Sequence, residues 1–363
     1  MSKIKLTARP FNLRLKHPFG ISRGTITCAK NVLVTLSYDD IIAFGEASPS
    51  YYYGEDQESV IEYLHEFVKH KSIEEYITNI RSLKDDLAKF SSNSYRRSLP
   101  SARVALEMAF WDLIGKIDNK SLYQFFFNDD PFIDNGSSYE NVPYTSYTIG
   151  LDSLMVMENK VREAISAGYK VLKLKLGLGY EHDVNVLRSI GDIVKENNCT
   201  LRVDANGGWD IDLTKKMLDI LPAYNVELLE QPLPRGQYSL LALVLDSTKI
   251  PIFVDEDCIS YTDIESLAGK VHGINIKLMK TGSILEAHNM ISLAKSYNLK
   301  VMLGCMIESS CGISAAVHIS PLADYVDLDG HLLLESDPFS GLMIEDNKVV
   351  PSFDAGLGVS LVL

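Results

Sequence analysis

The sequence predicts an α/β protein in which a (β/α)8-type barrel, a modified TIM barrel, follows an N-terminal α+β capping domain. Two observations lead to this fold class. From about residue 143, eight short apolar segments alternate with helical segments, and this alternation is typical of a barrel of parallel strands. Before that point, strand-like alternation gives way to helical periodicity, which favours an α+β unit.

The capping domain is expected over residues 1–125. Its first 60 residues or so alternate apolar and polar side chains, as strands do. Helices are then expected at about 56–70, 73–90 and 100–117. The tail, residues 336–363, is punctuated by Gly and Pro, and we expect it to pack back on this first domain.

The barrel is expected over residues 126–335. Its eight strands are expected at 144–149, 171–176, 201–204, 226–230, 252–255, 273–278, 300–304 and 325–328. Barrel enzymes carry their chemistry at the C-terminal ends of the strands. Charged residues at those ends are therefore the candidate site.

Two of the expected strands carry lysines on the face that should line the barrel. Lys173 and Lys175 share one face of their strand because side chains alternate, while leucines share the other. Lys277 likewise faces away from the apolar side of its strand. Strands 2 and 6 lie opposite each other in an eight-stranded ring, so Lys175 and Lys277 should face each other. Two bases on opposite faces of one carbon can remove a proton and return it to the other side, as in a racemase or epimerase. The alternative to lysines inside the barrel is a half-exposed strand whose lysine-bearing face is in contact with solvent.

Three neighbouring strands each end in a carboxylate: Asp204, Glu230 and Asp255, spaced 26 and 25 residues apart. Three converging anions repel one another unless a cation lies between them. Oxygen ligands favour a hard ion, Mg²⁺ before Mn²⁺ or Ca²⁺. Three separate helix N-caps are the alternative, but glutamate is a poor cap. A lysine acts as a base only when its pKa is lowered, and we expect Lys173 and the metal ion to do this for Lys175.

At this point the sequence resembles the enolase superfamily, muconate-lactonizing-enzyme subgroup, over nearly the whole chain. The matching motifs are Lys173-Leu-Lys175, Asp204-Ala-Asn206, Glu230-Gln231-Pro232, Asp255-Glu256 and Asn275-Ile-Lys277. The resemblance implies one Mg²⁺ per subunit on the three carboxylates and a base pair of Lys175 and Lys277. It also implies that Lys173 tunes Lys175 and touches the substrate carboxylate. Asp257 and Ser283 depart from the family's usual Ser and Gly, which puts fine specificity in doubt.

Within that subgroup the chain is most similar to the dipeptide epimerases, which invert the α-carbon of the C-terminal residue of an L-aminoacyl dipeptide. The segment Val326-Asp-Leu-Asp-Gly330 carries this resemblance. It implies that Asp327 and Asp329, which share one face of a strand, bind the free ammonium of the dipeptide. Other substrate-side residues that the resemblance implies are Thr148, Glu308, Phe19 and Arg23. The last two lie in a loop, residues 17–24, for which a surface hairpin is the structural alternative.

Two other functions stay open on the sequence alone. A lyase of the o-succinylbenzoate synthase or muconate cycloisomerase type would use the same metal and lysines without needing Asp327 and Asp329. A catalytically silent barrel is the alternative outside enzymes, although unused buried charges are costly. Side-chain preference is not readable from these motifs, but the apolar segment Gly330-His-Leu-Leu-Leu334 favours a hydrophobic C-terminal residue over an acidic one.

Composition argues against several other classes. The net charge of −13 over 363 residues disfavours nucleic acid and anionic membranes as partners. No apolar stretch approaches the roughly 20 residues of a membrane helix, and the first residues lack a signal-peptide core. Five scattered cysteines without CxxC spacing indicate reduced thiols in a cytoplasmic protein. Members of the resembled family are often homo-oligomers, so the resemblance implies one here.

Overall fold

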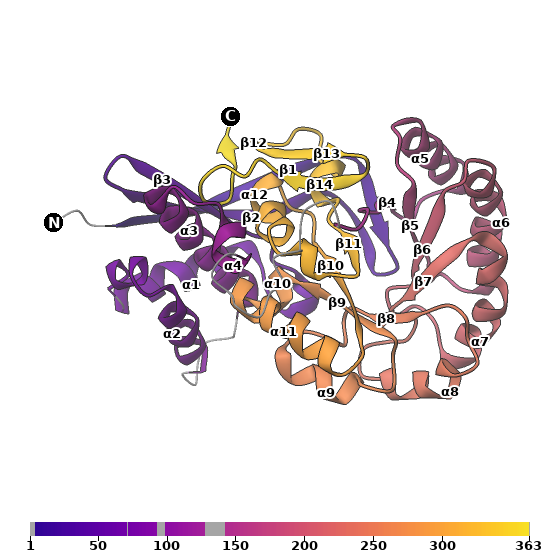
Figure 1. The fold of residues 1–363 in the computed structure, drawn as a ribbon. Coiled ribbons are helices and arrows are strands. Elements are labelled where there is room, and N and C mark those ends of the chain that lie inside the picture. The colour runs from indigo at the N-terminus through magenta and orange to yellow at the C-terminus, as the bar shows by residue number, and fades with distance from the viewer. Residues whose placement is uncertain (1–3, 71, 93–98, 128–141, 363) are drawn as a thin grey trace.

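The fold is described from a computed structural model, which covers residues 4–70, 72–92, 99–127 and 142–362. Figure 1 shows an N-terminal body, coloured indigo to violet, beside a barrel whose strands and helices run from magenta to yellow. Eight parallel strands and an N-terminal antiparallel sheet confirm the predicted fold class.

The N-terminal body is a three-stranded antiparallel meander covered by helices. Its strands are β1 (Lys5–Ile21), β2 (Gly24–Tyr38) and β3 (Ile41–Ala47). Its helices are α1 (Gln57–His70), α2 (Ile80–Ser92) and α3 (Pro100–Asp118). The helix expected over 73–90 is divided into a 3-10 turn at Glu74–Ile77 and α2. The Thr78 hydroxyl donates to the Glu75 carbonyl oxygen (3.0 Å), and such local bonds compete with a continuous helix.

Helix α3 joins the two parts of the molecule. It is buried along nearly its whole length because it packs on β3 on one side and on α10 (Leu278–Thr281) of the barrel on the other. A Cβ at Gly45 would lie 1.9 Å from the Ala105 carbonyl oxygen, so only glycine allows β3 to approach α3 this closely.

The barrel sheet runs in simple sequential order from β4 to β11. Its strands are β4 (Tyr147–Ile149), β5 (Val171–Lys175), β6 (Thr200–Asp204), β7 (Val226–Glu230), β8 (Ile252–Val254), β9 (Gly273–Lys277), β10 (Lys300–Gly304) and β11 (Tyr325–Asp327). An isolated parallel bridge between Thr145 and Val326 links the first and last strands, which nearly closes the ring. All eight strands lie within a few residues of their predicted positions.

Helices cover the outside of the barrel, as Figure 1 shows. They are α5 (Leu154–Ser166), α6 (Tyr180–Glu196), α7 (Ile211–Ile220), α8 (Ala242–Leu245), α9 (Ile264–Leu267), α11 (Ile284–Ser296) and α12 (Ser310–Val317), together with α10. The apolar faces of strands and helices form one large core between the two layers. Among the described residues, no helix is long and apolar enough to cross a membrane.

The C-terminal segment returns to the N-terminal body. It forms the short strands β12 (Phe339–Ser340), β13 (Leu342–Glu345), β14 (Lys348–Pro351) and β15 (Ser360–Leu361). The Phe339 ring meets the edges of Phe11 and Phe44 at 6.1 and 5.2 Å, and the Leu357 N–H donates to Asp112 of α3 (2.9 Å). The domain boundary predicted at residue 125 falls within α4 (Leu122–Phe127), and the division itself stays a prediction.

Candidate active site

A cavity of about 770 Å³ lies where the C-terminal ends of the barrel strands face the N-terminal body. Most of the residues singled out from the sequence line it: Phe19, Arg23, Thr148, Lys173, Lys175, Asp255, Lys277, Asp327 and Asp329. Asp204 and Glu230 are fully buried at the ends of their strands. Glu308 is also buried, but it is absent from the described residues that line the cavity.

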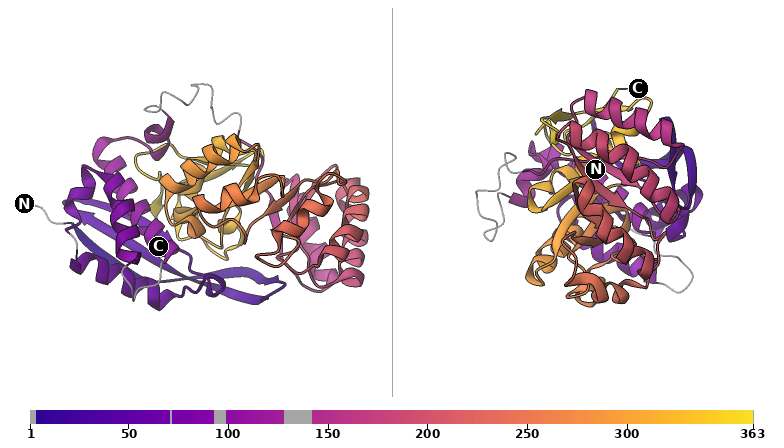
Figure 2. Two further views of the ribbon diagram at one scale, coloured as in Figure 1. Left: turned by 90° about the horizontal axis from the view of Figure 1, so that it is seen from below. Right: turned by 90° about the vertical axis from the view of Figure 1, so that its right-hand side faces the viewer.

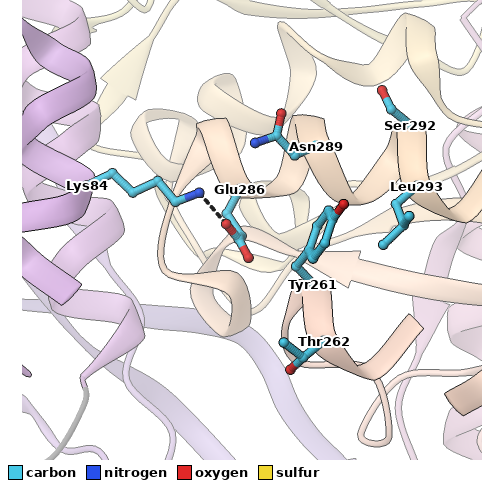
Figure 3. Close-up of a pocket in the computed structure, with 7 residues that line it drawn as sticks. All are labelled: Lys84, Tyr261, Thr262, Glu286, Asn289, Ser292 and Leu293. Atoms are coloured by element: carbon cyan, nitrogen blue, oxygen red, sulfur yellow. Dashed lines mark ion pairs between the residues drawn. The ribbon is translucent and has the colours of Figure 1, made fainter. Parts of the chain in front are cut away.

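A second hollow of about 490 Å³ lies between α2 and α11. Figure 3 shows that its two charged residues, Lys84 and Glu286, point at each other and form an ion pair. The other lining side chains are neutral: Tyr261, Thr262, Asn289, Ser292 and Leu293. This hollow brings together no set of acids and bases comparable with the strand ends, so the larger cavity is the candidate active site.

Lys173 lies at the centre of the charged network. All five residues of β5 are buried, and Lys173 Nζ lies 2.6 Å from Asp327, 2.7 Å from Glu230 and 3.3 Å from Asp204. Burial alone would lower the pKa of Lys173, but the charge of Asp327 and the other carboxylates outweighs it and raises the pKa. Lys173 is therefore held as an ammonium.

The two proposed bases lie on opposite strands, since β5 and β9 are separated by β6, β7 and β8 in the sheet. Lys175 Nζ lies 2.6 Å from Asp204, and Lys277 Nζ lies 2.9 Å from Asp255. Burial would lower the pKa of Lys277, but the charge of Asp255, its hydrogen bond and the charge of Glu230 together raise the pKa, and the positive charge of Lys173 opposes that rise. Each lysine is paired with a carboxylate from a neighbouring strand end.

The three carboxylates lie close enough to repel one another. Burial first, and then the charge of Asp204, raises the pKa of Glu230 to about 7, and Asp255 adds to the rise. Asp204 and Glu230 face each other across neighbouring strands, and Asn275 donates to Glu230 Oε1 (2.7 Å). Among the described residues, no three His, Cys, Asp or Glu side chains converge on one point as a metal site requires, because lysine ammonium groups lie between the carboxylates.

This donor set nevertheless fits a hard divalent cation. The donors are three buried carboxylates on adjacent strand ends, and the ammonium groups now in contact with them show that the position attracts positive charge. Oxygen-only donors of this kind suit Mg²⁺. Asp204, Glu230 and Asp255 are the residues that could hold it.

Asp327 ends β11 and Asp329 follows it, and Lys173 links Asp327 to Glu230 of the acidic cluster. Asp327 accepts from the Ser146 hydroxyl (2.5 Å), and Asp329 accepts from the Thr148 N–H (2.5 Å). Burial would raise the pKa of Asp327, but the charge and hydrogen bond of Lys173, together with the Ser146 hydrogen bond, outweigh burial and lower the pKa to about 2. Burial, and then the charge of Asp327, raises the pKa of Asp329 to about 6. Two carboxylates on one wall can receive a cationic group.

One buried cation of the site, Lys280, was not predicted from the sequence. Lys280, on the single turn of α10, donates to Asp255 Oδ1 (2.6 Å) and to the carbonyl oxygens of Asp255, Cys258 and Asn275. Lys280 follows Lys277, the last residue of β9, by three residues, and both lysines contact Asp255. That spacing is the signal that could have revealed it, but a helix after β9 would have had to be foreseen.

Residues 17–24, expected as a loop, form the tip of the β1–β2 hairpin, in which only Ser22 and Arg23 lie between the paired strands. This tip reaches the mouth of the barrel, as the left view of Figure 2 shows. Arg23 donates to the Asn206 carbonyl oxygen (2.9 Å) and to Glu256 Oε1 (2.7 Å). Burial and then Asp255 and Glu256 raise the pKa of Tyr53, which lines the same cavity. The N-terminal body thus covers the acidic side of the site.

Family models match both halves of the chain. The model described as "Enolase C-terminal domain-like" matches residues 156–362. The model described as "Mandelate racemase / muconate lactonizing enzyme, N-terminal domain" matches residues 3–126. These matches agree with the resemblance seen in the strand-end motifs.

Similar proteins include several epimerases. The chain is 34% identical to an L-Ala-D/L-Glu epimerase of Bacteroides thetaiotaomicron, over 98% of this chain and 88% of that one. It is also 34% identical to a hydrophobic dipeptide epimerase of a Flavobacteria bacterium, over 99% of this chain and 98% of that one. Among solved structures, a dipeptide epimerase from Cytophaga hutchinsonii complexed with Mg and D-Ala-L-Val has a TM-score of 0.86 at 27% identity, covering 99% of this chain and 96% of that one.

Proposed function

We propose, from the premise that this chain belongs to the mandelate racemase / muconate lactonizing enzyme family of the enolase superfamily, that it is a magnesium-dependent dipeptide epimerase. The reaction inverts the α-carbon of the C-terminal residue of an L-aminoacyl dipeptide. The observation that carries the proposal is one cavity lined both by two lysines from opposite strands and by the Asp327–Asp329 pair.

Asp204, Glu230 and Asp255 would hold the metal ion. When bound, Mg²⁺ would neutralise these carboxylates and stabilise the second negative charge that develops on a substrate carboxylate when its α-proton leaves. The three acids interact with one another through their charges, which supports a shared cation.

Lys175 and Lys277 would be the two bases. They project into the cavity from strands on opposite sides of the ring, so a carbon between them is accessible from both faces. One lysine removes the α-proton as a neutral amine, and the other, as an ammonium, delivers a proton to the opposite face. Lys173 is held as an ammonium by its carboxylate neighbours, which suits it to binding the substrate carboxylate rather than to removing a proton.

Asp327 and Asp329 would bind the free ammonium of the dipeptide. Both line the cavity, and the Ser146 hydroxyl and the Thr148 N–H hold them in place. A lyase of the same family would have no need of this pair. The cytoplasmic location and the homo-oligomeric state expected from the sequence stay predictions.

The test is α-proton exchange in D₂O with Mg²⁺, measured by mass spectrometry against a pooled library of L-Ala-L-X dipeptides. We expect deuterium at the α-carbon of the C-terminal residue in a subset of members, and no exchange after chelation of the metal. Calorimetry with Mg²⁺ alone, on the unmodified chain and on Asp255→Asn, checks the metal site independently. Exchange in no member would refute the dipeptide assignment and favour the lyase, while absence of Mg²⁺ binding would favour a silent barrel.

A further inference from the structure

Arg23 is the one guanidinium among the described residues that line the cavity, and both of its terminal nitrogens already donate hydrogen bonds. Nη1 donates to the Asn206 carbonyl oxygen (2.9 Å), and Nη2 donates to Glu256 Oε1 (2.7 Å). Its guanidinium carbon lies 4.4 Å from the centre of the Tyr52 ring. These three contacts hold the side chain across the mouth of the barrel.

Glu256 makes this pairing hard to break. Its side chain is only 2% exposed, and its Oε2 atom has no hydrogen-bond partner among the described residues. If Arg23 turned toward a ligand, Glu256 would lose its ion pair and stay buried, which is strongly unfavourable. Among the described residues, Arg23 lines the cavity and Glu256 does not. A ligand in the cavity therefore contacts Arg23 while Arg23 stays paired with Glu256.

Aromatic and apolar side chains also line the cavity near Arg23. Tyr52 and Tyr53 line the cavity with ring centres 5.0 Å apart, edge to face. Ile26 and Tyr52, which also line it, are 45% and 40% exposed. Large apolar side chains left open to a cavity favour an apolar ligand group, because covering them removes apolar surface from water.

This part of the cavity faces the C-terminal residue of a bound dipeptide. If Asp327 and Asp329 hold the ammonium on the β11 side, and the carboxylate lies toward the metal ligands at the ends of β6, β7 and β8, the remaining substituent of the α-carbon between Lys175 and Lys277 is the side chain. It is left to point out of the barrel toward the N-terminal body. Arg23 contacts the residues that follow β6 and β8, Asn206 and Glu256. The side chain of the C-terminal residue therefore meets the wall of Arg23, Tyr52, Tyr53 and Ile26.

We infer that the enzyme takes dipeptides with an apolar C-terminal residue and discriminates against acidic ones, because Glu256 already neutralises the guanidinium that an acidic side chain would meet at this wall. The inference rests on the proposed function. It also chooses between the specificities of two similar proteins, an L-Ala-D/L-Glu epimerase and a hydrophobic dipeptide epimerase, each of which is 34% identical to this chain. A cationic side chain is disfavoured by the guanidinium itself.

The wild-type test compares three dipeptides of similar length: L-Ala-L-Met, L-Ala-L-Glu and L-Ala-L-Gln. We expect kcat/KM for α-proton exchange with L-Ala-L-Met to exceed that with L-Ala-L-Glu at least tenfold, with L-Ala-L-Gln in between because it is polar but uncharged. An L-Ala-L-Glu value equal to or above that of L-Ala-L-Met overturns the inference and leaves the epimerase function standing. Exchange with none of a full dipeptide library overturns both.

Glu256→Gln tests the cause. It keeps an oxygen acceptor for Arg23 but removes the charge, so Arg23 becomes available and the L-Ala-L-Glu to L-Ala-L-Met ratio of kcat/KM should rise about tenfold. Because Glu256 is next to Asp255, the substitution could lower kcat/KM for both substrates alike, and such a common loss does not change the ratio. Lys30→Met is the matched control, since Lys30 is an exposed cation that also lines the cavity, and it should leave the ratio within threefold. An unchanged ratio in Glu256→Gln, or a loss of L-Ala-L-Glu activity alone in Lys30→Met, overturns the role of the Arg23–Glu256 pair.

Discussion

Replacing Asp329 with asparagine tests the feature that separates an epimerase of dipeptides from a lyase. Asp329 is 3% exposed and accepts from the Thr148 N–H at 2.5 Å. Asparagine has the same shape and keeps an oxygen for that bond, so the wall should stay folded. The substitution removes only the negative charge that we propose faces the substrate ammonium.

The expected loss follows from the strength of one hydrogen bond between charged groups. Such a bond contributes about 1.5–3 kcal/mol, which corresponds to a fall in kcat/KM of about 10- to 150-fold. Asp327 stays charged, since Lys173 holds its pKa at about 2, so some ammonium binding should survive in the variant. A loss confined to KM would place the interaction in ground-state binding.

The assay pairs two substrates, L-Ala-L-Met and N-acetyl-L-Ala-L-Met, with the wild type and Asp329→Asn. Acetylation removes the ammonium, so the variant should lose activity on the free dipeptide and little on the acetylated one. Because the pKa of Asp329 is about 6, protonation below pH 6 should also lower wild-type kcat/KM for the free dipeptide. Equal losses on both substrates, or no loss on either, would refute ammonium recognition by Asp329 and return the lyase to consideration.

Three further substitutions test the mechanism and the fold. Lys277→Met should slow epimerisation by about 10²- to 10⁴-fold, while deuterium exchange persists with only one of the two epimers of the substrate. Exchange with both epimers would contradict the two-base mechanism. Gly45→Ala should destabilise the chain by about 1–3 kcal/mol or more because its Cβ would meet the Ala105 carbonyl oxygen, and an unchanged melting temperature would disprove this close contact. Burial lowers the pKa of His318 to about 4 from 6.5, so about 3 kcal/mol of stability, present above pH 6.5, should be lost as the pH falls through 4. Urea titrations at pH 7 and pH 4 should show a smaller difference for His318→Gln, and an equal difference would refute the assignment.

The barrel was predictable because its strands are buried on both faces and its chemistry is confined to their ends. The expected strand at 171–176 is Val171–Lys175 in the structure, and the expected strand at 226–230 is unchanged. The expected strand at 144–149 is shortened to Tyr147–Ile149. Its first residues have other partners, since the Thr145 N–H donates to the Asn347 carbonyl oxygen, and periodicity carries no information about such a distant partner.

Only part of the candidate site was predictable from the sequence. Alternation within a strand was enough to predict which lysines and carboxylates face the interior, because a strand has only two faces. It did not predict which charges pair. Arg23 and Glu256 are 233 residues apart and belong to different parts of the molecule, so their contact depends on how the hairpin lies over the barrel. Lys280 was missed for a related reason. It lies on a single helical turn, which is too short to show a helical periodicity in the sequence.

The buried charges themselves argue against a barrel without chemistry. Four ammonium groups and five carboxyl groups lie together, nine-tenths or more buried, at one end of the strands: Lys173, Lys175, Lys277, Lys280, Asp204, Glu230, Asp255, Asp327 and Asp329. Replacing a buried ion pair with apolar residues of similar volume is often neutral or stabilising by about 1–4 kcal/mol. A purely structural barrel would therefore lose nothing by filling this space with leucine and methionine. The network instead leaves Glu230 with a pKa near 7 and Asp329 with one near 6, an electrostatic strain that a bound cation and a substrate ammonium would each relieve.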